Sequence, residues 1–558
     1  MKGVVRPGKM RAAARVLTLV LAAGLLLTAL SGCAVRKGTT MWFEHSTKKI
    51  LHGYEDPVGH AAYTLFLAKN EYEACQLAVR FTEDRENFTL TASIPAQNGK
   101  ASDDISVEIF NEHYIPVTMS APFLAVSPEE DGRAEEYPDA LSPHDAPVFV
   151  PADSTQPFYV LVHAGREAKA GDHDVVLTAK SGETVLGEAK LTVHVWNFAL
   201  DDTPAMTAVS DVSRYSMALK TDPSMDGDEA QRLYEKYYEF ALEYHISPYT
   251  LPYDVLDDRA AKYLDDPRVT GFRVNYGNDD YLRAVAEKLS RKPEWLKKAY
   301  FYFLDEPNDE DRYMDLVKLS RHLLEIFPQA RIVSPFFVNP DMYLGNDALD
   351  YCFGTVNIWC LKLFCFDRDR PQNIYTAKQL RKLAPIADRL AERRAMGEDV
   401  WSYVCWEPGE PYLTLYINMQ GMQHRLIFWQ NYLLGANGFL YWSSNYWDRI
   451  NDPWESGATV NDLSPYVYGD GSLLYNGNKV GVDGPCSSLR LEAVRDGVDD
   501  YTYLSMLEQS GMAREDVLKI VKRLTASLTE YAENDDQLYR VRYALGGMLE
   551  KTACNLPG

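Results

Sequence analysis

The first third of the chain alternates short apolar stretches with turn-forming residues. Between residues 40 and 200, period-two patterns are separated by Gly, Asp and Ser, and Asp201–Pro204 is interpreted as a linker into the next domain. Many short, regularly spaced strands are typical of an antiparallel β-sandwich. We expect such a domain over residues 40–200, with strands at Glu73–Phe81, Phe88–Ile94, Ile105–Phe110, Phe158–His163, Asp174–Ala179 and Lys190–Trp196.

After Pro204 the pattern changes to apolar runs that alternate with stretches of helical periodicity. Strands that alternate with helices form parallel sheets, and eight strands in about 240 residues match a (β/α)8 barrel. We expect this barrel over residues 205–480. Its expected strands are Met206–Val212, Ile246–Leu251, Val269–Val274, Ala299–Asp305, Arg331–Pro335, Thr355–Leu361, Val400–Trp406 and Gly438–Ser443.

Helical patterns lie between most of these strands and again after the barrel. A short β-like piece and three helices predict a small C-terminal β/helical region over residues 481–558 that packs on the barrel. The expected barrel helices are Glu229–Tyr244, Tyr281–Ser290, Asp311–Phe327, Ala377–Arg394 and Ile417–Leu434, and the C-terminal ones are Tyr501–Leu507, Glu515–Tyr531 and Asp536–Lys551.

The fourth expected strand ends in two adjacent carboxylates. The aromatic run Tyr300–Leu304 is typical of a buried parallel strand, and Asp305, Glu306 and Pro307 follow it. Barrel enzymes keep their catalytic groups at this end of the strands, and glycoside hydrolysis needs a carboxylic acid to protonate the leaving oxygen. Asp305 and Glu306 are therefore candidate catalytic residues. The alternative is an accidental pair at a strand exit, since the chain has 80 Asp and Glu.

Aromatic residues supply a second signal in the later half of the expected barrel, where seven of the 10 tryptophans lie between Trp359 and Trp454. Trp and Tyr rings stack on the apolar faces of sugar rings. The alternative is barrel core, because side chains alternate in direction along a strand. His245 precedes its strand, and a lone His is commonly structural. The candidate substrate-binding residues are Tyr302, His245, Tyr403, Trp406, Glu407, Trp442, Asn445 and Trp447.

The N-terminus predicts export. Basic residues precede the apolar run Val16–Leu30, which is too short to span a bilayer. The sequence Leu30-Ser31-Gly32-Cys33 then resembles the lipobox of bacterial lipoproteins. The resemblance implies that residues 1–33 hold the signal peptide and lipobox, that Cys33 is acylated, and that lipid anchors the chain at the cell surface or in the periplasm. An ordinary signal peptide with a coincidental cysteine is the alternative.

Composition and the absence of several motifs limit the classes of ligand and cofactor that the chain is expected to bind. A net charge of −23 argues against nucleic acid and against an anionic lipid surface. The chain has no His-Glu-x-x-His zinc motif, no Gly-x-Ser-x-Gly elbow, no phosphate loop and no EF-hand sequence. We therefore expect a glycan substrate, no metal and no other cofactor. The sequence does not indicate an oligomeric state.

Six segments carry a family resemblance: Leu304–Pro307, Tyr441–Trp442, Gly469–Tyr475, Leu489–Tyr501, Asn70–Gln76 and the loop Tyr137–Leu141. They resemble glycoside hydrolase family 123 and the related bacterial domain of unknown function 4091. The resemblance covers nearly all of the mature chain and implies a β-sandwich, a (β/α)8 barrel and a small C-terminal region. The better-known family members are β-N-acetylgalactosaminidases that retain the anomeric configuration.

The family's mechanism accounts for two carboxylates in adjacent positions. Neighbours in a strand point to opposite faces, so they cannot easily flank one bond as acid and nucleophile. In a substrate-assisted route, the 2-acetamido oxygen of the sugar attacks C1 and forms an oxazolinium-like intermediate. The resemblance assigns Glu306 as general acid/base, and Asp305 as the group that orients the acetamido nitrogen.

Two other functions remain open from the sequence. One is a surface lipoprotein that binds glycans without cleaving them, and the intact acid pair argues against it. The other is a retaining glycosidase for a different sugar, with a protein nucleophile such as Glu407 after the seventh strand.

Overall fold

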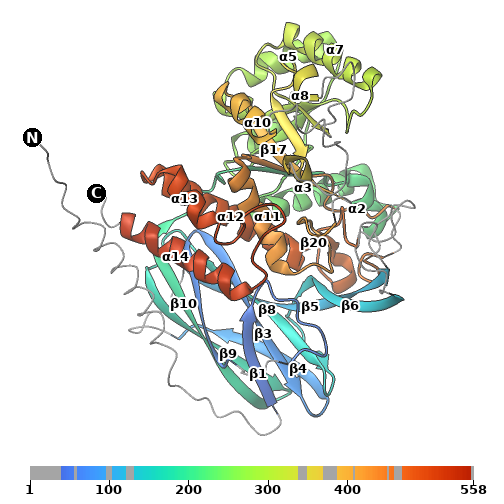
Figure 1. Ribbon diagram of the computed structural model, residues 1–558. Coiled ribbons are helices and arrows are strands. Elements are labelled where there is room, and N and C mark those ends of the chain that lie inside the picture. The colour runs from blue at the N-terminus through green and yellow to red at the C-terminus, as the bar shows by residue number, and fades with distance from the viewer. Residues whose placement is uncertain are drawn as a thin grey trace, which may run out of the picture.

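The computed structural model describes residues 39–55, 60–95, 104–120, 131–336, 348–367, 386–405, 409–448, 452–457 and 468–553. Cys33 and the expected signal peptide lie outside these residues. Within them, no helix combines the length and apolar character needed to cross a membrane. The β-sandwich and the barrel lie on opposite sides of a set of late helices, which are drawn in orange and red in Figure 1.

Two five-stranded sheets form the N-terminal sandwich and confirm the expected architecture. Their strand orders are β1-β3-β8-β5-β6 and β2-β10-β9-β4-β7. All neighbours pair antiparallel except β2 and β10, which are parallel. The strands are β1 (Thr39–His45), β2 (Ala62–Lys69), β3 (Glu71–Phe81), β4 (Arg85–Ser93), β5 (Ile105–Ser120), β6 (Asp131–Pro143), β7 (Val148–Val150), β8 (Thr155–Ala164), β9 (Gly171–Ser181) and β10 (Thr184–Ala199).

Eight parallel strands form the barrel, in the order β12-β11-β18-β17-β16-β15-β14-β13. No ladder joins β12 to β13 in the described part of the chain, but the Arg273 amide donates to the Tyr249 carbonyl at 2.7 Å, so the barrel is nearly closed. All eight expected strands are confirmed. They are β11 (Thr207–Ser210), β12 (Ser247–Pro248), β13 (Phe272–Val274), β14 (Ala299–Tyr302), β15 (Ile332–Phe336), β16 (Ile358–Lys362), β17 (Asp399–Val404) and β18 (Gly438–Tyr441).

The helices between the strands cover the outside of the barrel. The helix expected from Ile417 begins only at Gly421, and residues 377–385 of another expected helix lie outside the described residues. The helical segments are α2 (Arg214–Thr221), α3 (Gly227–Glu243), η1 (Asp258–Ala260), α4 (Ala261–Asp265), α5 (Asp279–Leu289), α6 (Pro293–Lys298), α7 (Glu310–Ile326), α8 (Ala348–Tyr351), η2 (Leu363–Phe366), α10 (Ile386–Ala395) and α11 (Gly421–Leu434).

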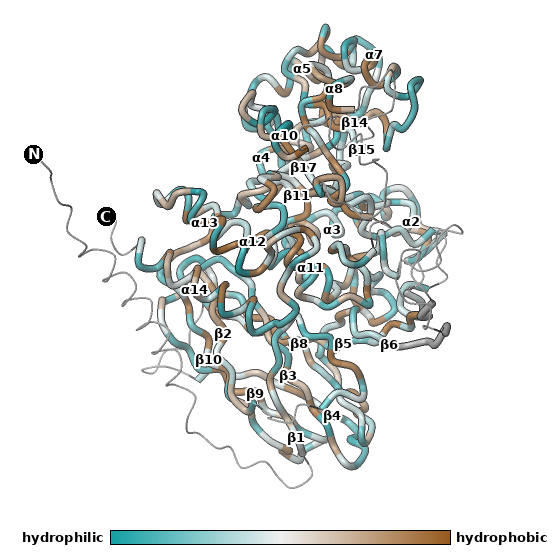
Figure 2. The backbone as a smooth tube through the Cα atoms, viewed as in Figure 1, coloured by the Kyte–Doolittle hydropathy of each residue, from teal (hydrophilic) through white to brown (hydrophobic). Residues whose placement is uncertain are grey.

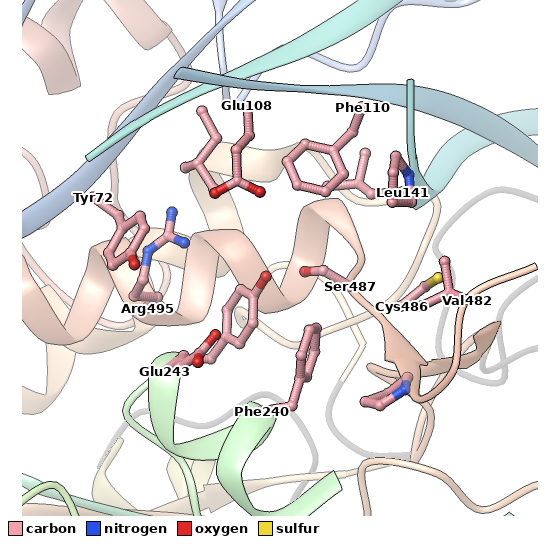
Figure 3. Close-up of a pocket in the computed structure, with 14 residues that line it drawn as sticks. Tyr72, Glu108, Phe110, Leu141, Phe240, Glu243, Val482, Cys486, Ser487 and Arg495 are labelled. Carbon is pink, nitrogen blue, oxygen red and sulfur yellow. The ribbon is translucent and has the colours of Figure 1, made fainter. Parts of the chain in front are cut away.

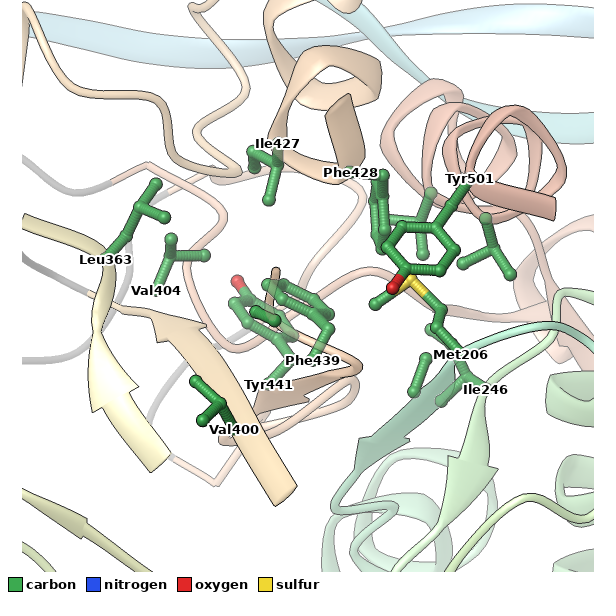
Figure 4. Close-up of a cluster of buried hydrophobic side chains, with 14 of the residues drawn as sticks. Met206, Ile246, Leu363, Val400, Val404, Ile427, Phe428, Phe439, Tyr441 and Tyr501 are labelled. Atoms are coloured by element: carbon green, nitrogen blue, oxygen red, sulfur yellow. The ribbon is translucent and has the colours of Figure 1, made fainter. Parts of the chain in front are cut away.

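Alternation along the strands divides the barrel's apolar residues between two cores. Outward side chains such as Val400 and Phe439 pack with Phe428 of α11 in the larger core (Figure 4). Inward side chains such as Tyr300 and Trp401 fill the barrel itself. Figure 2 shows hydrophobic segments along β14, β15 and β17, as expected for parallel strands buried on both faces.

The C-terminal region differs from the expectation in its helix bounds. The first helix begins at Leu489, twelve residues before the expected Tyr501, because a helix buried on nearly every side loses its 3.6-residue apolar period. The next helix ends at Val521 and not at Tyr531. The elements are β19 (Tyr475–Asn476), η3 (Gly477–Val480), β20 (Pro485–Cys486), α12 (Leu489–Gln509), α13 (Arg514–Val521) and α14 (Asp535–Ala553).

Buried charges join these helices to the sandwich and to α11. Arg490 of α12 donates to Asp139 of β6, with Nη2 2.8 Å from Oδ2. The segment Tyr137–Leu141, expected as a loop, is therefore part of strand β6 and of this contact. Arg425 of α11 donates to Glu73 of β3 at 3.0 Å. We call the whole set the ionic joint; it comprises Glu71, Glu73, Asp139, Arg425, Arg490, Asp496, Asp500 and Arg542.

Candidate active site

Strand β14 places two carboxylates at the carboxyl end of the barrel. Tyr302 is the last residue of the strand and faces the barrel interior, and Asp305 and Glu306 follow it. The Ser334 hydroxyl holds the strand exit by donating to the Leu304 carbonyl at 3.0 Å. Glu306 has φ +38°, in the left-handed region that a residue other than glycine rarely adopts. Such backbone conformations cluster at functional sites.

Asp305 is exposed at this end of the barrel, and its carboxylate accepts a hydrogen bond from a side chain that faces the barrel interior. The Tyr302 hydroxyl donates to Oδ1 at 2.7 Å. Partial burial raises the pKa of Asp305 and the neighbouring charge of Glu306 adds to that, while the Tyr302 hydrogen bond opposes both. Arg312 of α7 donates to the Asp305 carbonyl. The backbone and one carboxylate oxygen are therefore fixed.

Glu306 is partly covered, with 29% of its side chain exposed. The Tyr403 hydroxyl, from β17, donates to Oε1 at 2.5 Å. The ammonium of Lys362, at the end of β16, lies 3.2 Å from the same oxygen. Burial and the negative charge of Glu306 raise the pKa of Tyr403 far above its usual range, so the phenol keeps its proton and remains a donor.

Trp442 provides an aromatic wall at the end of β18. It is partly buried, packs against the barrel interior, and lies 4.9 Å from the Tyr446 ring, centroid to centroid. Its Nε1 donates to Asp470 Oδ2 at 2.9 Å, and the Tyr441 hydroxyl donates to Oδ1 of the same carboxylate at 3.0 Å. Burial raises the pKa of Asp470 to about 6, against those two hydrogen bonds. Asp470 thus orients the indole.

Three predicted substrate-binding residues are engaged elsewhere. Trp447 is fully buried and therefore belongs to the core, and its Nε1 donates to Ser472 Oγ at 2.9 Å. Both amide atoms of the buried Asn445 bond the Ser213 backbone, at 2.7 and 3.0 Å. His245 precedes β12, at the opposite end of the barrel from the carboxylates, and pairs with Asp499 at 2.9 Å.

The remaining predictions have different outcomes. Tyr302 and Tyr403 reach the carboxylates themselves, so the structure places them as partners of Asp305 and Glu306. Trp406 and Glu407 lie outside the described residues, and their roles stay predictions. Sequence analysis missed Lys362, although a lysine that ends an apolar parallel strand is the same kind of signal as Asp305. It also missed the support that Asp470 gives to Trp442.

Two cavities among the described residues are candidate parts of the site. One, of about 210 Å³, lies by the loops that follow β12 and β13, at the same end of the barrel as the carboxylates, and Arg214, Asp254 and Arg273 line it. The other, of about 230 Å³, lies between the sandwich and α3, with Glu108 and Glu243 in its wall (Figure 3). None of its lining residues comes from the carboxyl end of a barrel strand.

The chemistry available at the barrel mouth is that of carboxylic acids beside aromatic rings. Glu306 Oε1 accepts a hydrogen bond from Tyr403 and forms an ion pair with Lys362, and Asp305 presents an exposed carboxylate beside it. Within the described ranges, no group of three or more His, Cys, Asp or Glu is arranged to hold a metal ion. The side chains present can donate and accept protons, orient an amide and stack on a sugar ring.

Comparisons with known proteins identify the family and support the fold. A sequence model of the catalytic domain of glycoside hydrolase family 123 matches residues 228–507. A family 123 glycoside hydrolase from Clostridium perfringens, studied for glycolipid glycan hydrolysis, superposes with a TM-score of 0.67 at 12% identity, over 93% of this chain and 100% of that one. No curated protein sequence matches.

Two further glycoside hydrolase structures are more distant. A family 5 xyloglucanase from Bacteroides ovatus has 10% identity and a TM-score of 0.27, over 78% of this chain and 98% of that one. A family 39 enzyme from Bacteroides cellulosilyticus has 10% identity and a TM-score of 0.30, over 81% and 82%.

Proposed function

This chain belongs to glycoside hydrolase family 123, and from that premise we propose that it is a retaining enzyme of the β-N-acetylgalactosaminidase type. In this proposal the 2-acetamido group of the substrate is the nucleophile, Glu306 is the general acid/base and Asp305 orients the acetamido nitrogen. The observation that carries the proposal is the position of both carboxylates at one strand end, where each accepts a hydrogen bond from a tyrosine hydroxyl.

The reaction needs two proton transfers at Glu306. In the first step the acetamido oxygen bonds to C1, the glycosidic C1–O bond breaks, and Glu306 protonates the leaving oxygen. Asp305 accepts a hydrogen bond from the acetamido N–H and stabilises the positive charge that develops there. In the second step Glu306 takes a proton from water, whose oxygen bonds to C1 and opens the oxazolinium-like ring. Because C1 undergoes two displacements, the anomeric configuration is retained.

The arrangement of the tyrosines supports these separate roles. Tyr302 bonds only one oxygen of Asp305 in the described structure, and Asp305 is exposed, so its other oxygen can meet a substrate N–H. Trp442 is held by Asp470 with its ring at the barrel mouth, where it can stack on a pyranose. The Clostridium enzyme was studied for glycolipid glycan hydrolysis, which is consistent with a glycan substrate here.

A panel of aryl glycosides tests the proposal. We expect turnover of 2-acetamido substrates, little turnover of the matching 2-hydroxy sugars, and tight inhibition by a thiazoline that mimics the cyclic intermediate. Asp305→Asn should slow all 2-acetamido substrates, whatever their leaving group, because it acts on ring formation.

Two other outcomes would replace the proposal. Covalent trapping of a protein side chain by a fluorinated glycoside, without thiazoline inhibition, would indicate a protein nucleophile and a different sugar. Sugar binding without turnover of any glycoside would indicate a glycan-binding protein.

We also propose that the enzyme is an exported lipoprotein anchored through Cys33. The lipobox-like sequence Leu30–Cys33 supports this, and the substrate would then be an extracytoplasmic glycan. Cys33→Ala should abolish acylation and release the protein from membranes or block its processing. An unmodified N-terminus well beyond residue 33, found by mass spectrometry of native protein, would contradict the anchor.

A further inference from the structure

Lys362 brings a fully buried ammonium to the candidate acid/base. It ends strand β16, its side chain has no exposed surface, and its Nζ lies 3.2 Å from Glu306 Oε1. Removing an ammonium from water is costly unless it is paired. A lysine at the mouth of a barrel could reach solvent along its flexible stem. The inward position of the side chain therefore indicates that the ammonium is kept there to pair with the Glu306 carboxylate.

Two neighbouring strands bring an ammonium and a hydroxyl to the same oxygen. Lys362 and Tyr403 are register partners on β16 and β17, and the Tyr403 hydroxyl lies 2.5 Å from Glu306 Oε1. The Lys362 ammonium also lies 5.5 Å from the centre of the Tyr403 ring. Because an ammonium has no lone pair, a proton on Oε1 would face the positive charge of Lys362 at 3.2 Å with no acceptor there. The proton that Glu306 transfers must then reside on Oε2, the other oxygen of the carboxylate.

We propose that Lys362 is a positioning residue for the acid/base reaction, a role that rests on the proposed function of Glu306. Lys362 and Tyr403 hold Oε1, which leaves Oε2 as the oxygen that exchanges protons with the leaving group and with water. The ammonium also stabilises the carboxylate that forms when Glu306 gives up its proton, since an opposite charge this close favours the ionised form.

Other charged and titratable groups surround this pair. On β14 and its exit, Asp305 adds a negative charge and Tyr302 a phenol; Cys360 on β16 contributes a thiol that burial keeps protonated by raising its pKa far above normal. Lys362 also interacts with the buried Asp470 on the loop after β18. Two further cations act on these acids: Arg312 of α7 on Asp305, and Arg490 of α12 on Asp470.

The test compares pH–rate profiles of kcat/KM for Lys362→Met, Lys362→Arg and the parent enzyme, with a poor and an activated leaving group. Removing the charge should move the alkaline limb to higher pH, because an opposite charge at this distance favours the ionised carboxylate. It should also lower kcat on the poor leaving group, by about tenfold or more, and less on the activated one. Lys362→Arg should keep the limb in place.

Lys298→Met is the matched control. Lys298 is a partly buried lysine at the end of α6, directly before β14 and at the other end of the barrel, where its ammonium donates to backbone carbonyls. Its loss should leave the alkaline limb unchanged. If Lys362→Met proves too unstable to purify, Lys362→Gln removes the charge but keeps a donor, and the same shift is expected.

The outcomes separate this inference from the proposed function. If Glu306→Gln leaves the alkaline limb of the parent in place, Glu306 is not the acid and the proposed function fails. If Glu306→Gln abolishes the limb but neither Lys362→Met nor Lys362→Gln moves it, the inference about Lys362 is wrong. A uniform loss of activity for both leaving groups, with the limb unmoved, would assign Lys362 a purely structural role.

Discussion

The ionic joint and the barrel mouth both contain opposite charges at hydrogen-bonding distance, yet they differ in access to solvent. In the joint, the Arg425 and Asp500 side chains have no exposed surface, and Nε lies 2.7 Å from Oδ2. At the mouth, Lys362 is equally buried, but its partner Glu306 remains 29% exposed. One pair is closed on every side, and the other leaves a carboxylate oxygen open.

The backbone differs in the same way. Arg425 and Asp500 lie within the regular helices α11 and α12, whereas Glu306 follows a strand exit with φ +38°. Closed pairs on regular elements hold domains together, and breaking one leaves a buried charge without compensation. An open carboxylate on a strained turn is available for proton transfer. Four variants test this division, with effects that decrease in size.

Arg425→Met should have the largest effect, and on stability alone. It leaves Glu73 buried without its cation and removes one of the cations paired with Asp496 and Asp500, which keep Arg495 and Arg542, at a cost of about 3–5 kcal/mol of unfolding free energy. Chemical denaturation measures this loss, and the activity of the molecules that remain folded should be unchanged. Arg283→Met, which removes an exposed helical ion pair, should cost no more than about 0.5 kcal/mol. Equal effects of the two would contradict the role given to the joint.

Asp470→Asn should change how stability depends on pH. Burial raises the pKa of Asp470 from 3.8 to about 6, so this group stabilises the fold fully below pH 3.8 and the contribution is lost as pH rises to about 6. At ~1.4 kcal/mol per unit the loss is about 3 kcal/mol. The variant should lack this loss in denaturation curves from pH 4 to 7. The unfolding free energy of the exposed variant Asp483→Asn should vary with pH as that of the parent does. If Asp470→Asn also varies with pH as the parent does, the pKa of Asp470 is not raised.

Glu306→Gln should remove activity while the protein remains folded, with some loss of stability because the buried Lys362 ammonium loses its charged partner. Without a proton donor, turnover of substrates with poor leaving groups should fall by at least ~10²-fold, or about 2.7 kcal/mol of transition-state stabilisation. Activated aryl substrates should lose less, because their leaving groups need little protonation. Steady-state kinetics and a melting curve measure both. Glu310→Gln, an exposed substitution in the first turn of α7, serves as the control, and a matching loss there would invalidate the assignment.

Tyr302→Phe should have the smallest effect. It deletes the 2.7 Å hydrogen bond to Asp305, worth about 1.5 kcal/mol for a charged acceptor, and should lower kcat/KM on 2-acetamido substrates about tenfold. Tyr300→Phe is matched to it: that hydroxyl is buried two residues earlier and has no hydrogen-bond partner among the described residues. If Tyr300→Phe loses as much activity as Tyr302→Phe, the Asp305 contact is not the cause.

The family-like segments show how far local sequence could be interpreted. Residues 304–307 were assigned to catalysis, and their place at a strand end supports that. The segments Asn70–Gln76, Tyr137–Leu141 and Leu489–Tyr501 carried the same resemblance without an assigned role. The structure brings them together in the ionic joint, where Arg490 meets Asp139. Their charges gave no sign of this in the sequence, because a charged residue ordinarily indicates a solvent-exposed position.

The sequence by itself determined the sandwich, the eight barrel strands and the carboxylate pair, because apolar periodicity and turn residues are local signals. Only the tertiary structure decided which aromatic residues reach the mouth: Trp442 does, and Trp447 is buried in the core. It also decided that Lys362, 56 positions from Glu306 in the sequence, lies 3.2 Å from its carboxylate. The closure of the barrel places strand ends side by side that are far apart in the chain, and no local pattern specifies which side chains then meet.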